Sequence, residues 1–131
     1  MATMHVRWFQ AQLQKWLSAQ NKSILLTEHL EMRGMGNGQA IFAMHMDQEI
    51  LILIEGLLDE NGFTVAKTVV HPDHINQGLA RSAYEAIFQY VPAIHSDSIL
   101  IPPADRLWHS LIERHPEIHW DGNRFHWEHK A

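Results

Sequence analysis

The stretch from Thr68 to Tyr84, TVVHPDHINQGLARSAY, constrains the fold of this chain more than any other part. An apolar, strand-like run ends before Pro72, and a polar loop closes on Gly78, just before a helix-like sequence that begins at Leu79. The first backbone N–H groups of a helix have no intrahelical partner and lie at the positive end of the helix dipole. A strand, a glycine turn and a helix N-terminus in this order therefore predict a site for a phosphate group.

The sequence before this stretch predicts a helix and then antiparallel strands. Apolar residues over 6–17 recur with helical spacing and predict an amphipathic helix. Residues 24–32 fit either a short strand or a second short helix, and the spaced glycines of 34–38 favour a flexible turn. Strands are expected over 40–46, 50–57 and 63–71, because Asp47-Gln48 and the cluster at 59–62 are turn signals typical of hairpins.

The sequence after Gly78 predicts a parallel crossover. The helix that follows Gly78 should end before Pro92, and a strand over 93–100 should then lie parallel to the strand over 63–71. A further helix should run from Pro102 to just before Pro116, and Asp121-Gly122-Asn123 predicts a closing hairpin. These elements indicate a single α+β domain over residues 1–131.

Composition limits the classes of partner. The chain has 131 residues, no cysteine and a formal net charge of −5, from 10 basic and 15 acidic residues. We therefore expect no disulfide, no binding of nucleic acid through charge and a mild preference for a basic partner or substrate. The longest apolar run, over 50–58, is too short to cross a bilayer, so we expect a cytoplasmic protein without a membrane partner.

Four residues of the Thr68–Tyr84 stretch resemble a family motif. Val70 and Pro72 match a V-x-P step, and Gly78 and Ala80 match the end of R/Q-x-x-G-x-G/A, the acetyl-coenzyme A signature of the GCN5-related N-acetyltransferases. Ile75 departs from the Arg or Gln usual at its position. The resemblance implies a central, mostly antiparallel sheet with a parallel V-shaped splay between two strands, flanked by helices. It also implies that acetyl-coenzyme A is the co-substrate, bound by Thr68, Val69, Val70, Ile75, Asn76, Gln77, Gly78, Leu79 and Ala80.

The chemistry implied by the resemblance is transfer of an acetyl group from the thioester to an amine by direct attack. The acceptor would be a small molecule or a protein amine, and a homodimer is left open. The family often has an Asn and a general-acid Tyr where this chain has Ile101 and Trp108. The alternative is therefore a catalytically silent copy of the fold that serves as a binding or inhibitory module.

Two carboxylates are candidates for the general base. Glu55 lies in an apolar strand, where burial could raise its pKa, or else strand alternation turns it toward solvent. Asp97 could act as a base, bind a cationic substrate or cap a strand end. His71 and His74 border the expected cleft, and exposure in a loop is the plainer interpretation of both.

Eleven histidines raise the question of a metal site. His115 and His119 straddle Pro116, so they do not share a helical face, and the sequence lacks an H-E-x-x-H pattern. We therefore expect no metal. The aromatic residues Trp108, Trp120, Phe125 and Trp127 could line a ligand site, but packing of the last helix against the closing hairpin explains them with fewer assumptions.

Overall fold

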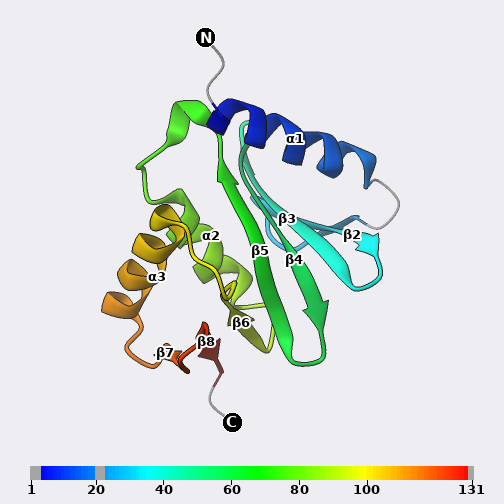
Figure 1. Cartoon of the computed structure of the whole chain (residues 1–131). Helices are drawn as coiled ribbons and strands as arrows, with labels where there is room; N and C mark the ends of the chain where they lie inside the picture. The colour runs from blue at the N-terminus through cyan, green and yellow to red at the C-terminus, as the bar shows by residue number, and fades with distance from the viewer. Residues whose placement is uncertain (1–3, 20–22, 130–131) are drawn as a thin grey trace.

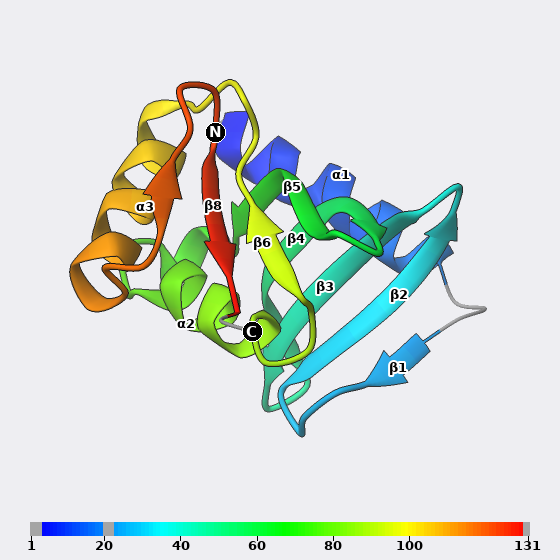
Figure 2. The same cartoon turned by 90° about the horizontal axis from the view of Figure 1, so that it is seen from below.

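The expected strands form one sheet in the computed structural model, which describes residues 4–19 and 23–129. The sheet has eight strands in the order β1-β2-β3-β4-β5-β6-β8-β7 (Figures 1 and 2). The strands are β1 Ser23–Leu25, β2 Leu30–Gly36, β3 Gln39–Met46, β4 Glu49–Asp59, β5 Gly62–Val70, β6 Ala93–His95, β7 His119–Trp120 and β8 Phe125–Glu128.

Helices cover both faces of the sheet. The helices are α1 Met4–Ser18, the short 3₁₀ helix η1 Pro72–His74, α2 Leu79–Ile87 and α3 Pro102–Arg114. Helix α1 lies on one face, and α2 and α3 lie on the other (Figure 1). The larger core fills the space between the sheet and α2 and α3, while a smaller core lies under α1. No helix in the described part of the chain is long and apolar enough to span a bilayer.

The one parallel pair in the sheet is β5 with β6, as the crossover prediction required. Its register is short, since it joins only Phe63 to Ile94 and Thr64 to His95. In the described chain no strand pairs with that edge of β5 from Val65 onward, so the two strands separate there. The pairing of β4 with β5 also shifts register at this level, between Glu55 and Gly56. The V-shaped splay expected from the sequence is confirmed.

The structure resolves one ambiguous sequence prediction and corrects another. The ambiguous segment over 24–32 is extended, because it contains β1 and the start of β2. The strand expected over 93–100 ends at His95. The buried Ser96 accepts the backbone N–H of Phe125 on its hydroxyl at 2.8 Å, and Asp97 Oδ1 accepts the N–H of Ile99 at 3.3 Å. Such side-chain bonds to the backbone compete with strand pairing, so the chain turns away.

Helix α1 is anchored to the smaller core by its aromatic residues. Phe9 and Trp16 are buried, whereas Leu17, at the end of the predicted apolar stripe, stays 46% exposed. The guanidinium of Arg33 from β2 lies 3.9 Å from the centroid of the Trp16 ring and donates to the Trp16 carbonyl at 2.9 Å. A cation over an aromatic face adds to the apolar packing, so α1 is held by both contacts.

Candidate functional site

The N-terminus of α2 is open toward solvent, as an anion site requires. Gly78 is its N-cap residue with φ 73°, a left-handed conformation that favours glycine, and no side chain caps the helix. The first intrahelical bond runs from the Ser82 N–H to the Gly78 carbonyl at 3.1 Å. The N–H groups of Leu79, Ala80 and Arg81 therefore precede the helical ladder and remain available to a phosphate.

Arg81 adds a positive charge to this helix end. Its Nη2 atom lies 3.6 Å from the position that a Cβ on Gly78 would occupy, and its Nη1 donates to Ser110 Oγ on α3 at 3.0 Å. Its Nε is buried without a hydrogen-bond partner among the described residues. A guanidinium fixed beside three free N–H groups suits a doubly charged phosphate. The motif pointed to position 75 for this charge, and the sequence analysis did not assign Arg81.

The splayed half of β5 places the three predicted strand residues differently. The Thr68 hydroxyl lies 2.6 Å from the hydroxyl of Tyr84 on α2. Val69 is buried on the opposite face, in the core under α1, and the Val70 carbonyl accepts from His5 Nε2 at 2.6 Å. The side chain of Val69 is therefore closed to a ligand, whereas one backbone edge of this half-strand has no paired strand among the described residues.

The loop before α2 combines exposed side chains with an unusual backbone. Ile75 is 45% exposed, so the residue at the motif's Arg or Gln position presents an apolar side chain to solvent. Asn76 has φ 65°, a second left-handed residue close to Gly78. The side-chain oxygen of Gln77 lies 3.2 Å from Nδ1 of His74, so Gln77 is already engaged within the loop.

Glu55 faces α1, which neither sequence interpretation foresaw. Its Oε1 accepts from Gln12 Nε2 at 2.8 Å and from Lys15 Nζ at 3.1 Å, and only 13% of its side chain is exposed. Burial raises the pKa of Glu55, but the bonds from Gln12 and Lys15 and the charges of Lys15 and Lys67 outweigh it and lower the pKa overall. Of the two interpretations of Glu55, the one with a raised pKa is wrong, and Glu55 is ionised at neutral pH. Glu55 also borders an open pocket of about 660 Å³ between α1 and the β2–β3 hairpin.

The residues at the family's Asn and Tyr positions lie in different surroundings. Ile101, the N-cap residue of α3, is 52% exposed, whereas Trp108 is 1% exposed. The Trp108 ring packs edge-on against Tyr84 and stacks on Phe125 in the larger core. Trp127 is also buried and Trp120 is half-exposed, so packing accounts for all of these aromatic residues except Trp120.

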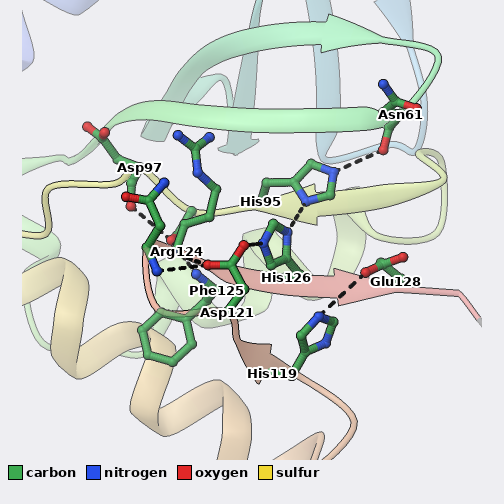
Figure 3. Close-up of polar contacts among 11 residues, drawn as sticks. Asn61, His95, Asp97, His119, Asp121, Arg124, Phe125, His126 and Glu128 are labelled. Atoms are coloured by element: carbon green, nitrogen blue, oxygen red, sulfur yellow. Dashed lines mark hydrogen bonds and ion pairs between the residues drawn. The ribbon is translucent and has the colours of Figure 1, made fainter.

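A hydrogen-bonded pair of histidines lies where β6 meets β8 (Figure 3). His95 Nε2 donates to the Asn61 carbonyl at 2.9 Å, His126 Nε2 donates to Asp121 Oδ2 at 2.6 Å, and the two Nδ1 atoms are 2.7 Å apart. Both outer partners are acceptors, so the Nε2 atoms donate outward and the two Nδ1 atoms face each other.

Asp121 accepts the outer hydrogen bond of His126. Backbone N–H groups of Arg124 and Asn123 and the His126 side chain donate to its carboxylate, and together they hold the pKa of Asp121 far below its usual range. Asp97, the second candidate base, lies near this group with its carboxyl directed away from the two rings (Figure 3). The sequence did not reveal the pair, because only the register between β6 and β8 brings His95 opposite His126.

Comparison with known proteins identifies a shared fold through solved structures and finds no match by sequence. No family model and no curated protein matches the sequence. The solution structure of YhhK, a candidate N-acetyltransferase of Escherichia coli bound to coenzyme A, matches with a TM-score of 0.56 and 10% identity, over 98% of this chain and 93% of that one. A candidate acyl-CoA N-acyltransferase from Klebsiella pneumoniae matches with a TM-score of 0.50 and 12% identity, over 97% and 90%. The fold is that of the GCN5-related N-acetyltransferases.

Proposed function

We propose that this protein binds acetyl-coenzyme A and transfers its acetyl group to an amine. The observation that carries the proposal is the open N-terminus of α2, with left-handed Gly78 and the partly unpaired guanidinium of Arg81, beside the free edge of β5. The helix end would hold the pyrophosphate, and the β5 edge would hydrogen-bond the pantetheine arm. A structural neighbour, YhhK, was solved with coenzyme A bound, which supports a ligand of this class.

The acetyl transfer itself would use the amine as its free base. The amine nitrogen attacks the thioester carbonyl, the C–S bond breaks, and coenzyme A leaves as a thiolate that takes up a proton. Glu55 and Asp97 remain the candidates for accepting the proton that the amine loses. If Glu55 is the base, Glu55→Gln should lower turnover by about 10²-fold or more and change cofactor affinity little. Equal turnover of the two proteins would leave Asp97 or the solvent in this role.

A second candidate function is that of a silent coenzyme A-binding module. It is favoured by the burial of Trp108, whose indole N–H cannot donate a proton as a tyrosine would, and by the ion pairing of Glu55. Release of free thiol in the presence of a panel of amines distinguishes the two functions. Cofactor binding without acetyl-dependent thiol release would favour the module.

Thermal unfolding with acetyl-coenzyme A and with free coenzyme A tests the cofactor site. A ligand at about a hundred times its Kd should stabilise the folded protein by roughly 2.7 kcal/mol, which raises Tm by several degrees. Gly78→Val should abolish this shift, because its side chain would fill the space in front of the helix N-terminus.

Gly36→Val is the matched control for Gly78→Val. Gly36 also has a left-handed φ, +88°, and nothing lies within 4 Å of a Cβ added there. Both substitutions therefore strain the backbone in the same way, and only Gly78→Val should lose the ligand. If millimolar coenzyme A leaves Tm of the wild-type protein unchanged, both the acetyltransferase and the coenzyme A-binding module are rejected.

A further inference from the structure

Three metal-ligating side chains converge beyond the C-terminal end of β5. Glu49 is the first residue of β4, His71 follows β5, and His74 ends η1. Glu49 Oε1 lies 3.0 Å from His74 Nε2 and 3.6 Å from His71 Nε2, and one ligand atom from each residue lies within 4.8 Å of the others. In a tetrahedral zinc site with bonds of about 2.0–2.1 Å, neighbouring ligand atoms are about 3.3 Å apart. The two separations from Glu49 Oε1 bracket this value.

The geometry of the Glu49–His74 contact fits a bound cation. His74 Nδ1 lies 3.2 Å from the Gln77 side-chain oxygen, an acceptor, so a neutral His74 carries its proton on Nδ1. Its Nε2 lone pair then faces the Glu49 carboxylate at 3.0 Å, and two acceptors at this distance repel unless a proton or a metal ion lies between them. A bond from the outer ring nitrogen to an amide oxygen is also the support that metal-bound histidines usually have.

His71 would change its hydrogen bonding when it binds a metal. Its Nδ1 accepts the backbone N–H of Asp73 at 3.1 Å, so the proton of a neutral ring is on Nε2. Coordination through Nε2 would shift that proton to Nδ1 and break the bond to Asp73. We therefore expect Glu49 and His74 to contribute most to affinity, and His71 to contribute less.

The donor set and its exposure point to the class of ion. Two imidazoles and a carboxylate suit Zn²⁺ or Co²⁺, whereas Mg²⁺ and Ca²⁺ prefer all-oxygen sites. The side chains of His71 and His74 are 24% and 32% exposed and that of Glu49 is 50% exposed, so an ion can enter from solvent. We propose that Glu49, His71 and His74 bind a divalent transition-metal ion, with a water molecule in a fourth position.

This cluster was not foreseen, and the proposal departs from the expectation of no metal. The sequence analysis considered histidines near the C-terminus, whereas Glu49 and His71 approach each other only because β4 and β5 are paired neighbours. Over residues 4–19 and 23–129 no other group of three such side chains comes as close. The remaining histidine–carboxylate contacts include His119 with Glu128 at 3.8 Å, a half-exposed pair without a third ligand.

Titration of the full chain, without an added histidine tag, with Co²⁺ tests the proposal. Co²⁺ in a tetrahedral site absorbs visible light far more strongly than six-coordinate Co²⁺, and Zn²⁺ should displace it and remove the absorption. We expect saturable binding of one ion per chain. Glu49→Ala and His74→Ala should each weaken Co²⁺ binding by at least about tenfold, and Gln77→Ala should weaken it less.

The matched control is His119→Ala, which removes a histidine from the two-membered contact with Glu128. This variant should bind Co²⁺ as the wild-type protein does. Circular dichroism verifies that each variant is folded, and Glu49→Gln replaces Glu49→Ala if the alanine variant unfolds. Weak binding without intensified absorption, or an equal loss in His119→Ala and His74→Ala, would overturn the proposal. No coenzyme A is present in this titration, so its result is independent of the proposed function.

Discussion

The two faces of the sheet are built on different principles. The face under α2 and α3 is a continuous apolar core, centred on Trp108, Tyr84 and Leu111, each of which is at most 2% exposed. The face under α1 has a smaller apolar cluster, and beside it the Glu55 carboxylate is bonded to Gln12 and Lys15. The first face therefore gains most of its stability from burial, with polar contacts such as Thr68–Tyr84 beside the core, while the other has a smaller core and a partly buried carboxylate whose contacts depend on pH.

The helices on the two faces also differ in the groups that they present to solvent. The helix whose N-terminus is open to a phosphate, α2, is fixed by the larger core, so its N–H groups are held in place before any ligand arrives. Helix α1 carries polar groups over the sheet and borders the open pocket beside Glu55. Under the proposed function, the N-terminus of α2 would hold the cofactor, and the pocket beside Glu55 is a candidate place for the acceptor.

The largest loss of stability should follow from Trp108→Ala. Removal of this ring leaves a cavity between α2, α3 and β8, and such substitutions cost about 3–5 kcal/mol. Urea unfolding at pH 7 measures the change. Phe9→Ala should cost less, because Phe9 belongs to the smaller of the two buried clusters and its side chain is smaller than that of Trp108. A greater loss for Phe9→Ala would reverse the proposed ranking of the two faces.

Glu55→Gln should have a smaller effect that depends on pH. We expect a loss of about 1–2 kcal/mol at pH 7, since Lys15 and Gln12 lose a charged acceptor. The folded-state pKa of Glu55 lies below its ordinary value of 4.5, so its contribution is complete above pH 4.5 and is lost as pH falls through the folded-state pKa.

The pH dependence of unfolding separates this contribution from simple packing. The difference in stability between wild type and Glu55→Gln should shrink as the pH is lowered from 5 toward the folded-state pKa. Trp108→Ala is the comparison, because its loss should stay nearly constant over the same range. A constant difference for Glu55→Gln would mean that the carboxylate charge contributes nothing.

Tyr84→Phe should cost about 1 kcal/mol, because it removes the hydroxyl bonded to Thr68 at 2.6 Å and leaves the ring in place. Burial raises the pKa of the Tyr84 hydroxyl, so it stays protonated and this cost should not vary between pH 6 and 9. Denaturant unfolding at both pH values measures it. The double variant Tyr84→Phe with Thr68→Val should lose less than the sum of the single variants, since the two hydroxyls are partners.

The smallest effect is expected for Leu17→Ser. The helical spacing placed Leu17 on the apolar stripe of α1, yet the side chain is 46% exposed near the end of the helix. We expect a change of less than about 0.5 kcal/mol in the free energy of unfolding. A loss comparable to that of Phe9→Ala would show that the smaller core extends further along α1 than the structure indicates.

Local sequence signals were sufficient to predict the helices, strands and turns. They were insufficient to predict which side chains meet between these elements. Turn residues such as Asp47-Gln48 located the hairpins, and Gly78 located the start of α2, because each of these features depends on its own few residues. Strand alternation correctly put Ile52 and Ile54 on the opposite side of β4 from Leu53, but the register shift of β3 at Met44 and His45 moves Ile50 to the side of Leu53. Alternation could not tell that α1 would cover Glu55, since this depends on how a distant helix packs.

The same limit explains the shortened strand and the histidine groups. The sequence over 93–100 predicted one strand. The strand is shorter because the Ser96 hydroxyl accepts the backbone N–H of Phe125, a residue distant in the sequence. His95 with His126, and His71 with Glu49, likewise meet through strand register. Register follows from pairing across the whole sheet, and no window of neighbouring residues contains it.

A binding site composed of main-chain N–H groups has a consequence for how this molecule can diverge. The Leu79 and Ala80 amides keep their direction whatever side chains surround them, provided that the residue before them can adopt the left-handed turn. Selection on such a site acts on backbone shape, so most of its side chains can be replaced in the course of evolution. Related proteins would then keep the same fold after their sequences have diverged.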